Sequence, residues 1–160
     1  MDLLSSNQAE ATFFCIGEQV EKHPDIYKKL LVKGHAVGNH TYSHMHAWKT
    51  NHEVFMADVK RAALFIESNL FRPPYGKLTL RTCKLLKKSY NIVLWDIITF
   101  DWDKDVDASK VLDYLKKHTE NGSIVLFHDT PKAFDRLKMI LPEYLNWSNE
   151  NNYVCKKIEL

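Results

Sequence analysis

The segment Ala36-Val37-Gly38-Asn39-His40-Thr41-Tyr42-Ser43-His44 runs from a short apolar stretch into a polar loop that carries two histidines four positions apart. Ahead of it, Thr12-Phe13-Phe14-Cys15-Ile16 is a β-prone run that stops at Gly17. Pro24 then opens a helical pattern that ends at Gly34. The order predicts a strand, a helix and a second strand, with the histidine loop at the end of the second strand.

The same alternation continues to the end of the chain. Further strands are predicted at residues 70–71, 92–95, 124–127 and 153–155. Helices are predicted behind caps at Asn51, Thr79 and Asp107, and a last helix covers residues 134–145. Short apolar strands that alternate with helices indicate a parallel sheet covered by helices, either open or closed into a barrel. Polar motifs that follow the strands favour the barrel type of site.

Size and charge narrow the class of protein. A chain of 160 residues with 45% hydrophobic content is expected to form one globular domain. The net charge of +2, with both signs interspersed, argues against nucleic acid and a basic membrane anchor as partners. No stretch approaches the roughly 18 apolar residues that a membrane span needs. The start of the chain, Met1-Asp2-Leu3-Leu4-Ser5, lacks the pattern of a signal peptide. Cys15, Cys83 and Cys155 are read as buried thiols.

Several polar motifs follow predicted strands and carry chemistry. His40 and His44 have side chains that bind zinc and similar divalent ions. Arg72-Pro73-Pro74-Tyr75-Gly76 is a stiff loop that can aim a main-chain N–H group. His128, in Leu126-Phe127-His128, stands where a general acid could protonate a leaving group, and Asp101-Trp102 follows another apolar run. Each motif alone also fits a structural turn or a surface residue, so their ordered combination carries the argument.

In that order, these motifs resemble the polysaccharide deacetylases of the NodB-homology type, carbohydrate esterase family 4. The resemblance covers nearly the whole chain and implies a distorted (β/α) barrel. Members of the family carry a Thr-Phe-Asp-Asp-Gly motif upstream of the first strand seen here, and this chain begins too late to contain it. We therefore expect one truncated domain over residues 1–160 that lacks its first strand and most of the following helix.

The resemblance also implies roles for individual residues. His40 and His44 would bind a divalent metal, most simply zinc, with cobalt, nickel or manganese as other candidates. The Tyr75 amide would help to bind the oxyanion, and Arg72 would orient the catalytic carboxylate. His128 would be the acid, Asp101 would hold its other ring nitrogen, and Trp102, Leu126 and Pro74 would contact the substrate. Family members often have a carboxylate where this chain has Ile98, which is a minor departure.

The implied function is hydrolysis of N- or O-acetyl groups on a polysaccharide or amino sugar. The absent Asp pair would supply the base and a metal ligand, so we expect impaired activity. Two alternatives stay open: an inactive homologue that binds carbohydrate or metal, and an amidohydrolase of small molecules. We expect an acetylated glycan as substrate and a homodimer that covers the exposed sheet edge. The family resemblance suggests the cell envelope or a secreted location, and the alternative, since the chain shows no signal peptide, is the cytoplasm.

Overall fold

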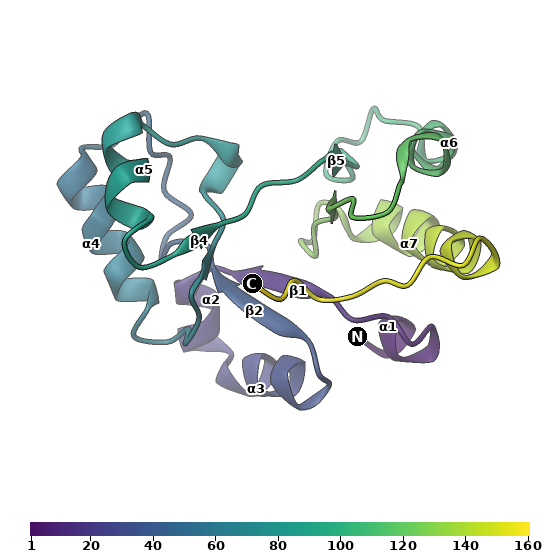
Figure 1. The fold of residues 1–160 in the computed structure, drawn as a ribbon, viewed down its shortest axis with the longest axis horizontal. Helices are drawn as coiled ribbons and strands as arrows, with labels where there is room; N and C mark the ends of the chain where they lie inside the picture. The colour runs from purple at the N-terminus through teal and green to yellow at the C-terminus, as the bar shows by residue number, and fades with distance from the viewer. The chain divides into compact units, whose positions relative to one another are not determined.

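A four-stranded parallel sheet in the order β1-β2-β3-β4 organises one unit of the chain, and a two-stranded parallel sheet, β5-β6, lies in a second unit (Figure 1). The computed structural model describes residues 1–160. The first unit comprises residues 10–94 with Met1 and residues 157–160, and the second comprises residues 2–9 and 95–156. None of the helices has both the length and the apolar composition that a membrane crossing requires.

The first unit contains repeated strand-helix connections. Its strands are β1 (Thr12–Cys15), β2 (Ala36–Asn39), β3 (Leu70–Phe71) and β4 (Asn91–Ile92). Its helices are α2 (Gly17–Lys22), α3 (Pro24–Val32), α4 (His52–Ala62) and α5 (Leu80–Leu86), with a 3-10 turn η1 (Pro74–Gly76) after β3. Strands and helices alternate as predicted, and the parallel pairing follows from the helical crossovers.

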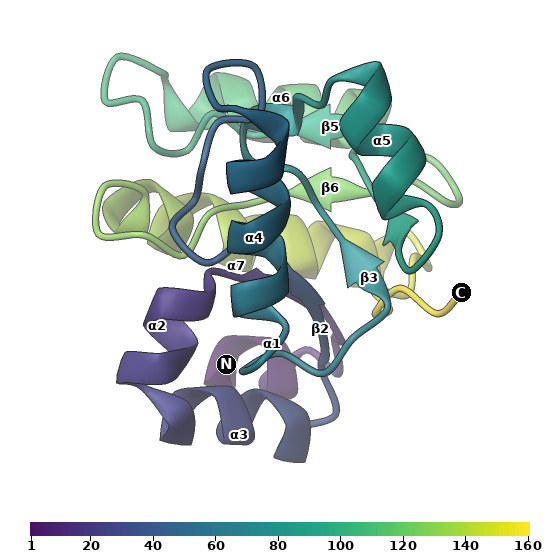
Figure 2. The ribbon, with the colours of Figure 1, turned by 90° about the vertical axis from the view of Figure 1, so that its left-hand side faces the viewer.

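The caps and the apolar face of α4 explain where it begins and what it covers. The Asn51 side chain accepts a hydrogen bond from the Glu53 amide at 2.8 Å, as the predicted cap requires. Phe55 and Val59 are fully buried in one cluster with Phe71 of β3. Figure 2 shows α4 in front of the sheet, which it covers. Thr79 caps α5 in the same way, through a 3.1 Å bond from the Thr82 amide.

The second unit is built around one helix pair and a short sheet. Its elements are α1 (Asp2–Ser6), β5 (Ile97–Ile98), α6 (Ala108–His118), β6 (Val125–Leu126) and α7 (Phe134–Glu150). The predicted cap Asp107 accepts a hydrogen bond from the Ser109 amide at 2.9 Å. The buried core of this unit lies between β5, α6 and α7 and consists of Ile97, Val111, Leu115, Ile140 and Tyr144. The spacing of apolar residues in α6 therefore predicted correctly which face of the helix is buried.

Two strand predictions were wrong. Residues 153–155 form no strand, because α7 runs on to Glu150 and the Tyr153 amide bonds back to the Ser148 carbonyl at 2.9 Å. Within 92–95 only Ile92 lies in a strand, and the additional strand β5 follows at Ile97–Ile98. Strands of two residues show too little alternation for a sequence pattern to place them. The predicted homodimer at the sheet edge stays a prediction.

Gly38 allows β1 and β2 to lie close together. A Cβ atom at this position would meet ring carbons of Phe14 at 2.5 Å, well inside van der Waals contact. Phe14 is paired with Gly38 in the register of β1 and β2. The glycine at the centre of β2 is therefore required by packing against the neighbouring strand.

We predict that Gly38→Ala destabilises the protein by about 1–3 kcal/mol, because the added methyl group overpacks the contact with Phe14. Urea unfolding would measure the change. In a Phe14→Leu background, which removes the ring carbons, the same substitution should cost less. An equal cost in both backgrounds would show that the clash lies elsewhere.

Candidate active site

The histidine loop begins with a buried asparagine at the end of β2. Asn39 is fully buried; its Oδ1 accepts from the Thr41 amide at 2.9 Å and its Nδ2 donates to the Val59 carbonyl at 3.1 Å. Thr41 is also fully buried and has a φ of 62°, which is unusual for a residue with a Cβ atom. These bonds and the left-handed conformation of Thr41 fix the backbone on both sides of His40.

Asp58 of α4 holds the rest of this loop. Its Oδ2 accepts from the amides of Tyr42 and Ser43 at 2.9 and 3.0 Å, and its Oδ1 accepts from the Ser43 hydroxyl at 3.0 Å. The loop is therefore tied to a helix that comes later in the chain. Sequence reasoning missed Asp58, because a lone acidic residue on a helix looks like any solvated side chain.

His40 and His44 lie together, as predicted. Their ring centroids are 4.9 Å apart with an interplanar angle of 63°. His40 Nδ1 is 2.6 Å from the carbonyl oxygen of Arg72. A carbonyl oxygen only accepts, so His40 Nδ1 carries the hydrogen and donates this hydrogen bond. This is the arrangement that prepares a histidine for metal ligation.

The two imidazoles thus fit as ligands of a divalent ion. No group of three or more His, Cys, Asp or Glu side chains in the structure could hold a metal ion. His40 and His44 are therefore a pair of candidate ligands, and their role in metal binding stays a prediction.

Arg72 follows β3 and lies beside the histidine loop. Its amide donates to the Asn39 carbonyl at 3.0 Å, which places the two loops side by side. The side chain is buried; Nε donates to the Val93 carbonyl at 3.2 Å and Nη2 to the Leu94 carbonyl at 2.7 Å. Burial lowers the pKa of the guanidinium to about 10, so it remains charged at neutral pH.

The proline loop has an unusual backbone at Tyr75. Pro74 is buried, and Tyr75 has φ 60° and ψ 11° inside η1. The Tyr75 ring is 57% exposed and lies edge-on to His44 at 4.9 Å between centroids. The left-handed backbone conformation fixes the direction of the Tyr75 N–H group. Its predicted role in binding an oxyanion, like the contact of Pro74 with substrate, stays a prediction.

The second unit holds the predicted acid and its partner. Asp101 is fully buried, and its Oδ1 lies 2.8 Å from His128 Nδ1. Its Oδ2 accepts from the His128 amide at 2.7 Å. An ionised carboxylate only accepts, so His128 Nδ1 donates and Nε2 is left to exchange a proton. The predicted pairing of His128 with Asp101 is therefore present.

Trp102 and Leu126 lie next to this pair. The Trp102 ring meets the His128 ring edge-on at 4.4 Å, which limits the rotation of the imidazole. The Leu126 carbonyl accepts from the amide and the hydroxyl of Thr99 at 3.2 and 3.0 Å. These bonds fix β6 just before His128. The substrate contacts assigned to Trp102 and Leu126 stay predictions.

The predicted site residues thus form two clusters. His40, His44, Arg72, Pro74 and Tyr75 belong to the first unit, whereas Asp101, Trp102, Leu126 and His128 belong to the second. That the two clusters face one cleft stays a prediction.

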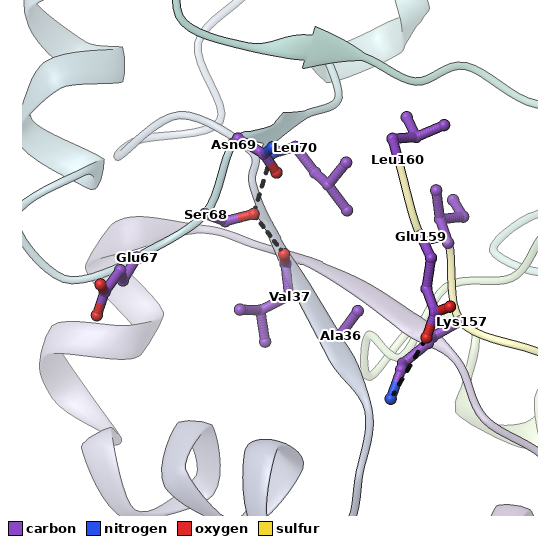
Figure 3. Close-up of a pocket in the computed structure, with 10 residues that line it drawn as sticks. Ala36, Val37, Glu67, Ser68, Asn69, Leu70, Lys157, Glu159 and Leu160 are labelled. Atoms are coloured by element: carbon purple, nitrogen blue, oxygen red, sulfur yellow. Dashed lines mark hydrogen bonds and ion pairs between the residues drawn. The ribbon is translucent and has the colours of Figure 1, made fainter.

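Figure 3 shows a hollow of the first unit, which has a volume of about 430 Å³. It is lined by Ala36 and Leu70 at the starts of β2 and β3, whereas His40 and Arg72 follow the ends of these strands.

Comparison with known proteins identifies the family. Residues 1–91 match the family model of polysaccharide deacetylases. The chain belongs to the polysaccharide deacetylase family. A peptidoglycan-N-acetylglucosamine deacetylase of Bacillus cereus is 32% identical in an alignment 155 residues long, which covers 89% of this chain and 56% of that protein. Chitin deacetylase 2 of Saccharomyces cerevisiae is 30% identical over 83% of this chain and 47% of its own length.

Solved structures of this polysaccharide deacetylase family confirm the predicted fold class. The crystal structure of a peptidoglycan N-acetylglucosamine deacetylase with a bound 4-naphthalen-1-yl-N-oxidanyl-benzamide superposes with a TM-score of 0.87 and 27% identity. The match covers 98% of this chain and 77% of that chain. The chain spans about half the length of the two relatives compared by sequence.

We predict that Asp58→Ala loosens the histidine loop, because it leaves the Tyr42 and Ser43 amides without their acceptor. The expected cost is about 1–3 kcal/mol of stability. Hydrogen exchange of these two amides should become faster, whereas amides in α5 should exchange as before. Asp58→Asn keeps one side-chain carbonyl and should show a smaller effect. Unchanged exchange in Asp58→Ala would contradict the anchoring role.

Proposed function

We propose that the protein is a hydrolase that removes acetyl groups from an acetylated amino-sugar polymer. The observation that carries the proposal is the His128 and Asp101 pair, in which a buried carboxylate orients an imidazole. Membership in the polysaccharide deacetylase family supports this chemistry. The names of the relatives, which act on peptidoglycan and chitin, support an N-acetylglucosamine polymer as the substrate class.

In the proposed reaction, water adds to the carbonyl carbon of the acetyl group, and its proton passes to the base that the family's Thr-Phe-Asp-Asp-Gly motif would supply. The C–N bond then breaks, acetate departs, and the sugar nitrogen takes up a proton to become an amine. His128 Nε2 delivers that proton, while Asp101 keeps Nδ1 protonated and stabilises the positive charge on the ring. The Tyr75 N–H group donates to the carbonyl oxygen as negative charge develops there.

His40 and His44 fit as ligands of a divalent ion, most simply zinc, and such an ion supplies Lewis-acid chemistry at an acyl carbonyl. Arg72 supports metal binding indirectly, because its carbonyl oxygen accepts a hydrogen bond from His40 Nδ1 and so orients the imidazole. A catalytic zinc usually has three protein ligands. With two histidines and no third ligand grouped with them, we expect weak metal binding.

The second candidate function is carbohydrate binding without turnover. The observation that favours it is the same lack of a group of three metal-binding side chains. Binding of an N-acetylglucosamine oligomer with no release of acetate, even with added zinc, would favour this candidate.

We predict that the 160-residue chain releases little acetate from N-acetylglucosamine oligomers in the presence of zinc. The same chain extended at its amino terminus by a Thr-Phe-Asp-Asp-Gly segment should release acetate readily, and a chelator should abolish this activity. Robust activity of the unextended chain would contradict the need for that motif and would require a base among its own carboxylates.

In the extended protein, we predict that His128→Ala lowers kcat by about 10²- to 10⁴-fold, because the leaving amine loses its acid. Zinc affinity, measured by calorimetry, should stay the same. His118→Ala, which removes an exposed histidine of α6, is the matched control and should leave kcat unchanged. A similar loss in both variants would contradict the role of His128.

A further inference from the structure

Positive charge is concentrated in one stretch of the first unit. Residues 68–95 contain six Lys and Arg and no Asp or Glu, although the whole chain has a net charge of only +2. Four of these cations lie in α5 or in the turn that follows it, and all four are exposed. We call them the basic ridge, which consists of Arg81, Lys84, Lys87 and Lys88.

The packing of α5 leaves the ridge at the surface. Thr82 and Leu86 are buried, and Leu86 belongs to the apolar cluster that includes Phe55 of α4. Figures 1 and 2 both show α5 beside α4. The inner face of α5 is therefore occupied by the core, and the charged positions lie on the part of the helix that the core does not cover.

Three of the ridge residues share one stripe of the helix surface. Arg81, Lys84 and Lys88 are separated by three and by four positions, which are the spacings that bring side chains together on a helix. The Lys88 amide donates to the Leu85 carbonyl at 3.3 Å, so the helical turn continues past the end of α5 at Leu86. The ridge is thus a row of cations along the helix axis.

No carboxylate of the chain neutralises this row. Lys22 pairs with Glu18 at 2.8 Å and Lys138 with Asp135 at 3.3 Å, whereas none of the four ridge residues has an ion pair. Like charges at these spacings repel one another and destabilise a helix. The ridge therefore carries a repulsion that an anionic partner would relieve.

The helix dipole explains only part of the row. Lys84, Lys87 and Lys88 lie at the carboxyl end of α5, where the dipole favours positive charge. Arg81 is the second residue of the helix, and the dipole disfavours a cation at that end. Compensation of the dipole thus does not account for a row that extends over the whole helix.

A shallow groove of about 360 Å³ follows the ridge. Leu85 of α5 lines it, and the lining residues of α4 are His52, Glu53, Met56, Ala57 and Lys60. Arg81 and Lys88 are the helix neighbours of Leu85, so the ridge and the groove run together. Met56 and Leu85 give the groove apolar surface, and Lys60 adds a cation on its other wall. Glu53 is the one carboxylate that lines the groove.

We propose that the basic ridge and this groove bind an anionic glycan through carboxylate groups on its sugars. Arg81 and Lys88 are seven positions apart, about 10 Å along the helix axis, which is too far for one small anion to bridge. A polymer with repeated carboxylates contacts the cations one after another, and the apolar groove accepts the C–H faces of its sugars. The inference rests on the proposed function for the class of polymer and adds that this polymer is negatively charged.

The position of the ridge gives this binding a use. Residues 77–79 alone separate η1, which carries Tyr75, from the start of α5. A glycan held at the ridge is therefore kept at a high local concentration beside this loop. The positive potential of the ridge also steers an anionic polymer to this face of the first unit.

The test compares two hexasaccharides as ligands of the 160-residue chain. One is the neutral oligomer of N-acetylglucosamine, and the other is hyaluronate, in which N-acetylglucosamine alternates with glucuronate. Calorimetry at low salt should give hyaluronate the lower Kd. Added salt should remove the difference, because it screens exposed charges.

Variants assign the preference to the ridge. Replacement of Arg81, Lys84 and Lys88 together by Gln should raise the Kd of hyaluronate by about tenfold and leave that of the neutral oligomer unchanged. The matched control replaces three lysines elsewhere by Gln and has the same net charge; it should bind as the wild type does. These control residues are Lys28, Lys29 and Lys117, all of them exposed.

Failure of hyaluronate to bind overturns the inference, as does a Kd at low salt that is no lower than that of the neutral oligomer. Equal weakening in the ridge variant and the control also overturns it. An oligothymidylate with the same number of charges that binds as tightly as hyaluronate contradicts a glycan as the partner. The wild-type preference and its salt dependence decide the matter if the ridge variant fails to fold.

The outcome for the ridge is separate from that for the proposed activity. Release of acetate by the extended protein, with no preference for hyaluronate in binding, contradicts the ridge alone. A preference for hyaluronate that the ridge variant loses, with no release of acetate by the extended protein, contradicts the proposed activity alone.

Discussion

The hydrogen bond between His40 Nδ1 and the Arg72 carbonyl is the contact on which the arrangement of the first unit's site depends. It joins the loop after β2 to the loop after β3, two strands that are neighbours only because parallel crossovers place them so. It also decides that Nδ1 is the nitrogen of His40 that donates to the protein backbone. The pairing of β2 with β3 therefore determines both how the two loops lie and which ring nitrogen of His40 donates a hydrogen bond.

In the second unit, a different acceptor, the carboxylate of Asp101, orients a histidine side chain, that of His128. A buried carboxylate is costly unless each oxygen is satisfied, and His128 satisfies both oxygens of Asp101 through its ring and its amide. The cost of burial is thus offset by the residue that the carboxylate orients. In both units, a histidine side chain is directed by an acceptor that cannot rotate away, and this precision comes from backbone or buried groups rather than from surface contacts.

The sequence predicted most of the helices and the residue pairs of the site, because caps such as Asn51 and Thr79 and the spacing of apolar residues are local signals. Sequence patterns failed to predict very short strands and residues whose partners lie far away in the chain. The strand β5 has two residues, too few to show alternation, and residues 153–155 looked like a strand although α7 continues nearly to them. Asp58 was missed because its partners in the histidine loop become neighbours only in the folded chain.

The left-handed backbone at Thr41, His44 and Tyr75 carries a consequence for how such a protein changes over time. Each of these residues has φ near 60°, a conformation that costs roughly 1 kcal/mol for a residue with a Cβ atom. Glycine would relieve that backbone cost at His44, so selection for thermostability alone would favour glycine there. Such a lineage would become more robust to heat while losing a candidate metal ligand, which is the form that a trade-off between stability and activity takes in this molecule.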